Sequence, residues 1–509
     1  MIVKAISSAV IGIDSHPVTV EVDLAAGLPL FSTVGLPDVA VRESKDRIKA
    51  AIKNSGYPFP GHHVTVNLAP ADIRKEGTAF DLPIAVAILA AQGILPAAPL
   101  ADYLTLGELS LDGSVKGVHG ALSAAFGAKA LGIRGMILPR PNAGEAALVA
   151  GIEVIPVDRL AEVVEFLGGR ASIAPLAVDA EELFRRSLDY PFDFSEICGQ
   201  KQAKRALEVA AAGSHNLLMI GPPGAGKTML AQRLVTILPD LTLAEAVETT
   251  QIFSVAGLLD RKEALLGTRP FRSPHHTISD AGLVGGGHTP RPGEISLAHH
   301  GVLFLDELPE FRKNTLDALR QPVEDGRVTI SRAALTATYP ARFMLVAAMN
   351  PCPCGFFGER NRPCRCTPPQ VRQYQGRISG PLLDRIDIHV EVPAVPYRDL
   401  AAREPGEPSA AIKARIERAR AIQKHRAGGD ETLVNARLSG RQLRAFCAID
   451  EDSRQLIEMA VDRLGLSARA HTRILRVART IADLEGLPGI LPSHIAEAIQ
   501  YRSLDRRIL

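Results

Sequence analysis

A glycine-rich segment in the middle of the chain has the residue types and spacing of a phosphate-binding loop. Residues 221–228 read Gly-Pro-Pro-Gly-Ala-Gly-Lys-Thr and follow the apolar run 217–220. This fits the pattern GxxxxGK[ST], in which backbone N–H groups surround phosphate at the start of a helix. We expect Lys227 to neutralise the β- and γ-phosphates and the Thr228 hydroxyl to hold Mg²⁺. The predicted nucleotide-binding residues of this loop are Gly221, Pro222, Pro223, Gly224, Ala225, Gly226, Lys227 and Thr228.

Two carboxylates follow a second apolar run, residues 301–305. Ligands bind at the carboxyl ends of strands in parallel sheets, which is where Asp306 and Glu307 would lie. We expect Asp306 to hold Mg²⁺, directly or through water, and Glu307 to polarise the attacking water as general base. An Asp-Glu pair alone is also typical of a solvated strand end. Together with the phosphate loop, it predicts ATP hydrolysis.

A third apolar run, residues 343–349, ends at Asn350. The amide of Asn350 can orient the lytic water or contact the γ-phosphate. The alternative is that Asn350 only forms a turn before Pro351, which is a common use of asparagine.

Four cysteines form the pattern C-x-C-x9-C-x-C, in which nine residues separate the two pairs. Four thiolates this close in sequence suit a tetrahedral Zn²⁺, and the intervening residues can form a loop that brings the pairs together. The C-x-C spacing is tighter than the usual C-x2-C, and the alternative is free thiols in a surface loop. The predicted zinc ligands are Cys352, Cys354, Cys364 and Cys366.

The composition limits the class of protein that carries these motifs. The chain has 509 residues, of which 46% are hydrophobic and 22% charged, as in a globular protein of roughly two to four domains. The net charge is only +2, so any binding of nucleic acid has to come from a local basic patch. The six cysteines, the absence of a secretory signal and the shortness of the apolar runs predict a cytoplasmic protein without membrane contact.

The hydrophobic patterning divides the chain into an α/β protein with several parts. Residues 1–170 alternate valine with polar residues in places and predict a mixed α/β domain, followed by a linker at 171–191. Residues 192–395 alternate short apolar strands with helices, which is typical of a parallel sheet. Residues 396–509 contain no strand pattern and predict a helical bundle.

These features together resemble an AAA+ ATPase. Four stretches narrow the resemblance: residues 272–277 (RSPHHT), 292–298 (PGEISLA), 324–332 (EDGRVTISR) and 350–355 (NPCPCG). They resemble the magnesium-chelatase-like AAA+ proteins of the YifB/ComM type, and the similarity runs along essentially the whole chain. It implies a parallel-sheet core with a phosphate loop, a C-terminal helical lid, and ATP with Mg²⁺ as cofactors.

The resemblance assigns two arginines. Residues 380–387 (GPLLDRID) are similar to the family's arginine-finger segment, so Arg385 would reach the γ-phosphate of a neighbouring subunit. The alternative for Arg385 is an ion pair with a nearby aspartate, Asp384 or Asp387. Residues 467–469 resemble the second sensor and would place Arg469 on ATP of the same chain.

Two other arginines, Arg473 and Arg476, compete with Arg469 for this role. A neighbour's arginine requires an oligomer, and the resemblance implies a homo-oligomeric ring, usually a hexamer.

The N-terminal part resembles a Lon-protease-type domain from residues 75–83 and 113–141. Such proteases use a Ser–Lys dyad, in which the lysine activates the serine. Ala79 stands at the nucleophile position and Leu122 at the lysine position. The domain therefore lacks the dyad, and we expect it to act as a scaffold for ring assembly or DNA contact.

Three segments between or beyond the nucleotide motifs could contact DNA through phosphate-binding Lys and Arg. One is a predicted hairpin around residues 324–341 that carries Arg327 and Arg332. The others are the loop 254–291, with Arg261, Lys262, Arg269 and Arg272, and the basic helix 411–428. For each of them, a solvated surface is the alternative.

The resemblance implies a ring-forming motor that moves along single-stranded and branched DNA. Its expected activity is that of a helicase that drives branch migration when transforming DNA is integrated. The first alternative is a magnesium-chelatase-type motor subunit that remodels a protein partner, although such subunits normally lack the Lon-like domain. The second is an ATP-dependent protease, which the missing dyad disfavours.

Overall fold

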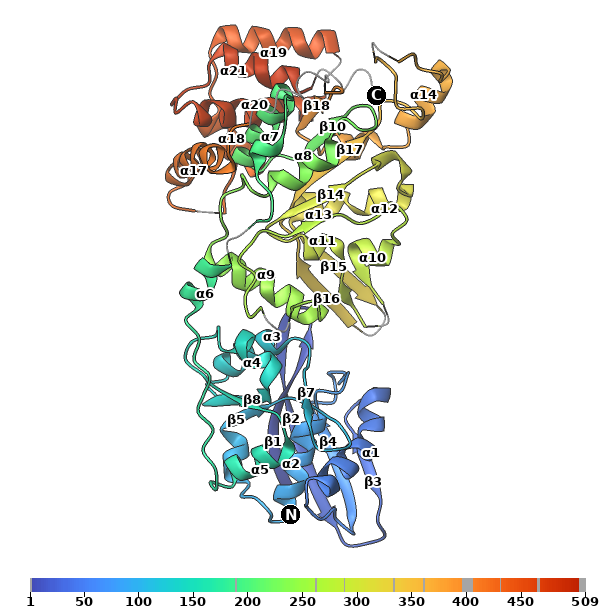
Figure 1. The fold of residues 1–509 in the computed structure, drawn as a ribbon, viewed down its shortest axis with the longest axis vertical. Coiled ribbons are helices and arrows are strands. Elements are labelled where there is room, and N and C mark those ends of the chain that lie inside the picture. Colours follow the sequence, from blue (N-terminus) through green and yellow to red (C-terminus); the bar gives the residue numbers. More distant parts are fainter. Residues whose placement is uncertain are drawn as a thin grey trace.

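The computed structural model has three parts stacked along its long axis (Figure 1): an N-terminal α/β domain, a core around a parallel sheet, and a helical C-terminal region. This confirms the predicted fold class. The residues that the structure describes are 2–187, 190–260, 263–287, 289–332, 335–359, 362–395, 406–430, 432–464 and 467–502.

The N-terminal domain is built on a seven-stranded sheet in the order β3-β4-β2-β1-β5-β8-β9. The long antiparallel pair β1 and β2 forms its centre, and the alternating valines Val18, Val20 and Val22 are fully buried, as strand patterning predicts. The strands are β1 (Ile2–Ile11), β2 (Asp14–Ala25), β3 (Phe31–Val34), β4 (His63–Ala69), β5 (Tyr103–Thr105), β8 (Gly135–Pro139) and β9 (Glu153–Val157); β6 (Glu108–Leu109) and β7 (Val115–Lys116) pair separately.

Helices cover this sheet, and the most buried is α2 (Asp81–Ala91), which is apolar around its whole circumference. The two positions expected for the Ser–Lys dyad of a protease hold apolar side chains. Ala79 packs against an apolar cluster, and Leu122 is fully buried within it. The other helices are α1 (Val39–Asn54), α3 (Ala121–Ala130), α4 (Arg140–Ala146) and α5 (Leu160–Leu167), and α6 (Ala180–Arg186) lies in the predicted linker.

The central sheet has five parallel strands in the order β11-β14-β17-β10-β18. Leu305 pairs with Ala347 and Met349 with Ile220, so the carboxyl ends of three neighbouring strands meet at one edge. The strands are β10 (Leu217–Ile220), β11 (Phe271–Arg272), β14 (Val302–Leu305), β17 (Met344–Met349) and β18 (Ile388–Glu391); the flanking helices include α7 (Lys201–Gly213), α8 (Lys227–Leu234) and α9 (Leu243–Ala256).

Between β11 and β17 the chain makes short helices and two small antiparallel pairs. The larger pair is a hairpin of β15 (Arg327–Arg332) and β16 (Leu335–Pro340), which follows α12 (Lys313–Ala318) and α13 (Arg320–Asp325). The other elements here are α10 (Asp280–Val284), β12 (Gly285–Gly286), β13 (Arg291–Pro292) and α11 (Glu294–Leu297); α14 (Pro368–Gln375) and α15 (Gly380–Leu383) follow β17.

The hairpin lies against the tip of β1 and β2, which reach from the N-terminal sheet to the core (Figure 1). Gly12, at this tip, has a φ of +66°, and a Cβ there would lie 3.1 Å from the carbonyl oxygen of Thr338. Ile11 and Ile13 pack against the apolar cluster that includes Ile330 of β15. The N-terminal domain and the hairpin therefore share apolar packing.

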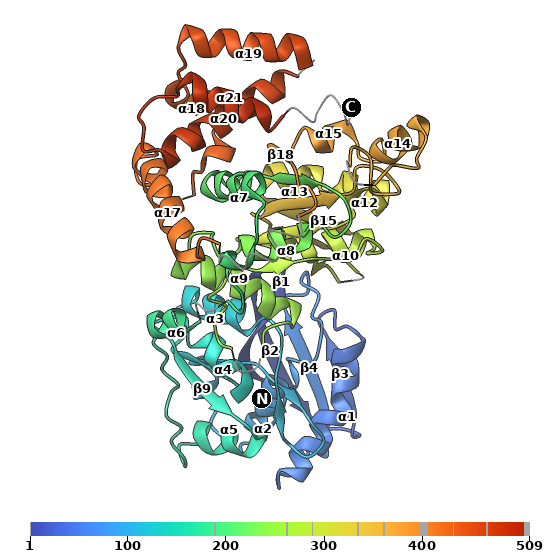
Figure 2. The same cartoon turned by 45° about the horizontal axis from the view of Figure 1, so that its top comes forward.

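The C-terminal region is helical, as predicted, and lies at the far end from the N-terminal domain (Figure 2). Its central helix α20 (Ala468–Leu484) packs on α21 (Pro492–Gln500), α17 (Ser409–Arg426) and α7. The remaining helices are α18 (Gly440–Phe446) and α19 (Glu451–Leu464). Within the described part of the chain, every helix is too short or too polar to span a bilayer.

Candidate nucleotide site

The predicted phosphate loop connects β10 to α8 at the carboxyl edge of the parallel sheet. Gly224 and Gly226 have φ values of +76° and +87°, a region that favours glycine, and a Cβ at either would meet nothing within 4 Å. The loop thus presents its backbone to an open cleft of about 440 Å³. Residues lining the cleft are Pro223, Gly224, Ala225, Gly226, Lys227, Thr228, Met229, Asp306, Glu307, Met349 and Asn350.

Lys227 is largely buried, and its ammonium group lies within this loop. Its Nζ donates to the carbonyl oxygens of Gly221 and Pro222, at 2.7 and 2.9 Å, and to Asn350 Oδ1 at 3.1 Å. Burial lowers the pKa of Lys227, and the nearby carboxylates of Asp306 and Glu307 oppose this shift. The structure therefore brings Asn350, at the end of β17, next to the phosphate-loop lysine.

Thr228 and Asp306 form a pair of oxygen donors beside the loop. Thr228 Oγ1 donates to Asp306 Oδ2 at 2.7 Å. Hydroxyl and carboxylate oxygens are the ligands that Mg²⁺ takes in nucleotide sites. The open glycine loop, the lysine and this pair of oxygens fit a nucleotide triphosphate with Mg²⁺.

Glu307 stands in an uncommon backbone conformation for a residue other than glycine, with a φ of +52°. Its backbone N–H donates to Asp306 Oδ1 at 2.9 Å, and its side chain is half exposed at the cleft. Glu307 Oε2 lies 3.1 Å from Nδ1 of His276. From the sequence, the His275–His276 pair is expected to serve packing, a turn or a phosphate contact, and the contact of His276 with Glu307 is not among these roles. The signal for it was the position of His276 in the family stretch 272–277, just after β11.

Arg385 does not face the cleft of its own chain. Its Nη2 lies 2.9 Å from Glu324 Oε2, and its Nε donates to the carbonyl oxygen of Arg320 at 3.1 Å. The expected alternative partners, Asp384 and Asp387, are not the ones that the structure shows. Arg385 thus contacts α13, directly before the hairpin, and its role toward a neighbouring subunit stays a prediction.

The three candidate sensor arginines of α20 differ in their contacts. Arg473 forms an ion pair with the buried Asp387, and Arg476 Nη2 donates to the carbonyl oxygen of Leu438 at 2.5 Å. Arg469 is exposed at the start of the helix and has no side-chain partner within the described residues. Arg469 does not line the cleft, and its contact with a nucleotide stays a prediction.

The four clustered cysteines come together as the spacing predicts. The Sγ atoms of Cys352, Cys354 and Cys364 lie 3.4 to 3.7 Å apart, and all four Sγ atoms lie within 4.8 Å of one another. Four thiolates at about 2.3 Å from a tetrahedral Zn²⁺ would lie about 3.8 Å apart. The backbone N–H groups of Arg365 and Phe356 lower the pKa of Cys354 to about 6. The donor set fits Zn²⁺.

The hairpin exposes both of its predicted DNA-binding arginines. Along β15, Val328 and Ile330 are buried whereas Arg327 and Arg332 are exposed. Neither arginine forms an ion pair within the described part of the chain.

The basic helix 411–428 is mostly engaged inside the molecule. Lys413 contacts Asp240, Arg415 contacts Glu208 and Glu407, Arg420 contacts Ser214, and Arg426 contacts Asp483. In the loop 254–291, Arg269 and Arg272 are also paired with carboxylates. Arg261 and Lys262 of that loop lie outside the described residues. The hairpin therefore carries the more available basic side chains.

Family models match most of the chain. The model "Magnesium chelatase, subunit ChlI" matches residues 193–400, "Subunit ChlI of Mg-chelatase" matches residues 20–142, and "Magnesium chelatase, subunit ChlI C-terminal" matches residues 406–502.

Curated relatives are similar over nearly the full length. The chain is 47% identical to the protein YifB of Salmonella typhimurium over 504 residues, covering 98% of this chain and 97% of that protein. It is 46% identical to "Competence protein ComM" of Haemophilus influenzae, with the same coverage. A more distant relative is the "Magnesium-chelatase 38 kDa subunit" of Cereibacter sphaeroides, 25% identical over 60% of this chain and 89% of that protein. The chain therefore belongs to the YifB/ComM family of magnesium-chelatase-like AAA+ proteins.

Proposed function

We propose that this protein is a ring-forming AAA+ ATPase and DNA helicase that acts in the cytoplasm. It couples ATP hydrolysis to movement along single-stranded and branched DNA, and it promotes branch migration when transforming DNA is integrated. The observation that carries the proposal is the hairpin β15–β16, which presents Arg327 and Arg332 to solvent and connects the strands that end at Asp306 and Asn350. A relative that bears the name "Competence protein ComM" supports the link to DNA uptake.

The chemistry at the cleft follows from the side chains that line it. Lys227 and the backbone of the glycine loop bind the phosphates, and Thr228 and Asp306 hold Mg²⁺, which neutralises charge on them. Glu307 accepts a proton from the attacking water. Asn350, hydrogen-bonded to Lys227, orients that water or the γ-phosphate.

Short segments of chain connect the nucleotide cleft to the hairpin. From Glu307 the chain passes through α12 and α13 directly into β15, and from β16 it returns to β17, which ends at Asn350. A shift of Glu307 or Asn350 would therefore move the hairpin as well, because only short segments connect these residues to it. The two exposed arginines would then change their contacts with the DNA backbone when ATP is hydrolysed to ADP.

The site is completed by arginines outside the cleft. Arg385 of one subunit would reach the γ-phosphate bound by the next subunit in a homo-oligomeric ring, for which six subunits is the expected number. Arg385 would reach that phosphate either by leaving Glu324 or while its ion pair with Glu324 stays intact. Arg469, exposed at the start of α20, would contact ATP of its own chain.

The remaining parts serve as supports. The four clustered cysteines hold one structural Zn²⁺, which fixes the loop that follows Asn350. Residues 1–170 form a Lon-protease-like scaffold without a dyad, 171–191 the linker, 192–395 the AAA+ core and 396–509 the lid.

A second candidate function is that of a magnesium-chelatase-type motor subunit that remodels a protein partner. The similarity to the magnesium-chelatase 38 kDa subunit favours it, but that similarity covers only 60% of this chain. A protease is disfavoured, because Ala79 and Leu122 supply neither nucleophile nor base.

The test is the steady-state ATPase rate of the full-length protein without DNA, with single-stranded DNA and with a branched junction. We expect DNA to stimulate hydrolysis and the protein to move the branch point. A basal ATPase that no DNA stimulates would favour the chelatase-type motor. Degradation of casein in the presence of ATP would instead support the protease.

A further inference from the structure

A second cavity lies at the opposite edge of the parallel sheet from the nucleotide cleft. Its volume is about 350 Å³, within the range of small-ligand pockets. Gly301 and Met344, which line it, stand at the amino ends of β14 and β17, whereas the nucleotide cleft lies at the carboxyl ends. Helix α17 and the turn around Arg437 close its other side. The cavity is thus separate from the ATP site and lies between core and helical lid.

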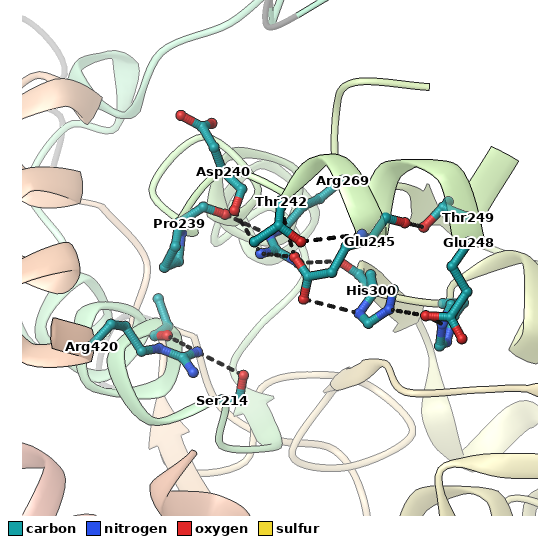
Figure 3. Close-up of polar contacts among 12 residues, drawn as sticks. Ser214, Pro239, Asp240, Thr242, Glu245, Glu248, Thr249, Arg269, His300 and Arg420 are labelled. Carbon is teal, nitrogen blue, oxygen red and sulfur yellow. Dashed lines mark hydrogen bonds and ion pairs between the residues drawn. The ribbon is translucent and has the colours of Figure 1, made fainter. Parts of the chain in front are cut away.

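The cavity is lined by five cationic side chains and three carboxylates. Two of the carboxylates are already neutralised. Asp240 forms an ion pair with Lys413. The carboxylate of Glu245 lies 3.4 Å from Nη2 of Arg269 and 3.3 Å from Nδ1 of His300. Figure 3 shows Glu245 between these two residues. The third, Glu417, is on the exposed face of α17.

Three arginines of the cavity have no carboxylate in direct contact, although Glu245 acts on Arg420 and Asp430 interacts with Arg342 from farther away. Within the described part of the chain, no ion pair joins Arg342, Arg420 or Arg437 to an acidic side chain. Arg342 and Arg437 are exposed and line the cavity, and their side chains make no hydrogen bond with the other described residues.

The guanidinium group of Arg420 has hydrogen-bond partners for only some of its N–H groups. Its Nη2 donates to Ser214 Oγ at 2.8 Å and to the carbonyl oxygen of Ala211 at 2.9 Å. Its Nε is buried and has no hydrogen-bond partner among the described residues. Desolvation lowers the pKa of Arg420 to about 9; the neighbouring Arg269 and Arg437 act in the same direction, and the carboxylate of Glu245 opposes them. Figure 3 shows the Arg420–Ser214 pair facing the group around Arg269 across the cavity.

Like charges gathered in a partly dehydrated space repel one another, and the repulsion is relieved when an anion lies between them. Arginine is also the side chain best shaped to bind phosphate, through two parallel N–H donors. A nearby cluster of histidines does not compete for this role. His299 Nδ1 accepts from the backbone N–H of Arg342 at 2.9 Å, and its Nε2 lies 3.2 Å from the carboxylate of Glu248, so His299 already has an acidic neighbour within the molecule.

We propose that this cavity is a phosphate-binding site formed by Arg342, Arg420 and Arg437. The phosphate belongs either to a small anion or to the backbone of a nucleic acid, which present the same chemistry to guanidinium groups. Because Arg342 follows the hairpin strand β16 and the other two arginines belong to the lid, the bound phosphate connects the lid to the base of the hairpin. This site goes beyond the proposed function, which does not require it.

The test uses the full-length protein with saturating Mg²⁺ and ADP, so that the nucleotide cleft is filled. Pyrophosphate and a short oligothymidylate are titrated separately by calorimetry. The test variant is Arg342→Gln/Arg437→Gln, whose side chains make no hydrogen bonds that the fold needs within the described residues. The matched control is Arg418→Gln, an exposed arginine of α17 that does not line the cavity.

We expect the double variant to weaken binding of the true ligand by on the order of tenfold or more, since it removes two charged donors. Loss with pyrophosphate identifies a small anion, and loss with oligothymidylate alone identifies a nucleic-acid phosphate. Arg418→Gln should bind like the unaltered protein. The proposal is overturned if neither ligand binds, or if the folded double variant binds both as tightly as the unaltered protein does. The pyrophosphate arm does not depend on any DNA-linked activity.

Arg420→Lys provides a second check, because it keeps the charge of the residue and removes the planar fork. We expect it to weaken binding less than Arg342→Gln/Arg437→Gln does. Equal affinity of all variants, with circular dichroism spectra that match the unaltered protein, would also contradict the proposal.

Discussion

Nδ1 of His276 lies 3.1 Å from Oε2 of Glu307, so the predicted general base is held by a histidine from the segment after β11. Such a contact occupies one oxygen of the carboxylate that should face the attacking water. We therefore expect His276→Ala to raise the basal ATPase rate. One hydrogen bond of about 1 kcal/mol corresponds to about fivefold in rate.

The matched control for this prediction is the adjacent His275, whose Nδ1 lies 2.9 Å from the Thr277 hydroxyl rather than at the cleft. His275→Ala should leave the basal rate unchanged. The measurement is steady-state hydrolysis without DNA. A fall in rate with His276→Ala would mean that the histidine assists Glu307 instead of restraining it.

Glu307 and Lys227 should separate catalysis from binding. Glu307→Gln keeps the phosphate loop and loses the base, so ATP should still bind while turnover falls by about 10²-fold or more. Lys227→Ala should lose binding as well, because its ammonium group lies inside the loop. Fluorescent-nucleotide binding and phosphate release measure the two quantities. Turnover at the unaltered rate in Glu307→Gln would exclude Glu307 as the base.

Arg385 should act on the neighbouring subunit. Arg385→Ala and Lys227→Ala chains are each expected to be inactive, and mixing them should restore part of the ATPase activity. Some interfaces in the mixture join an intact cleft to an intact arginine. Glu324→Gln is the control, because it removes the ion pair of Arg385 and keeps the guanidinium group. Absence of recovery in rings shown to contain both chains would count against this role.

The cysteine cluster should carry about one Zn²⁺ per chain, bound by four thiolates. Metal analysis of protein purified without added zinc measures the ratio, and thiol modification should release the ion. Cys364→Ser is expected to lose the metal, whereas Cys198→Ser, far from the cluster in sequence and absent from it in the structure, should retain it. Folded, active protein without zinc would refute the prediction.

The hairpin arginines should couple hydrolysis to DNA. Arg327→Ala/Arg332→Ala should keep the basal ATPase rate and lose DNA stimulation and branch migration. The salt dependence of DNA binding should become shallower by about one to two units of slope. Arg372→Ala/Arg418→Ala, which removes two exposed arginines elsewhere, is the control. Branch migration at the unaltered rate in the hairpin variant would show that the hairpin does not hold DNA.

Residue types and local spacing predicted those parts of the site that lie within one strand and the loop after it. Lys227, Asp306 and Asn350 each follow an apolar strand, and the parallel sheet brings those strand ends together. The cysteine cluster was predictable for the same reason, since its members are close in sequence.

Contacts between distant segments were not predictable in this way. His276 approaches Glu307 from the loop that follows β11, a strand of only two residues with no hydrophobic pattern to reveal it. The basic helix 411–428 looked like a solvated or DNA-binding surface, because its acidic partners Asp240, Glu208 and Asp483 are far away in the sequence.

The contact between Gly12 and the hairpin strand at Thr338 limits which substitutions the turn between β1 and β2 can accept. A Cβ at position 12 would lie only 3.1 Å from the backbone oxygen of Thr338, in a backbone conformation that favours glycine, and Ile11 and Ile13 on either side pack into the cluster of the hairpin. The turn between β1 and β2 and the apolar side of the hairpin are therefore packed as one contact between the N-terminal domain and the core. A chimera that takes its N-terminal domain from one relative and its core from another would have to exchange both segments as a pair.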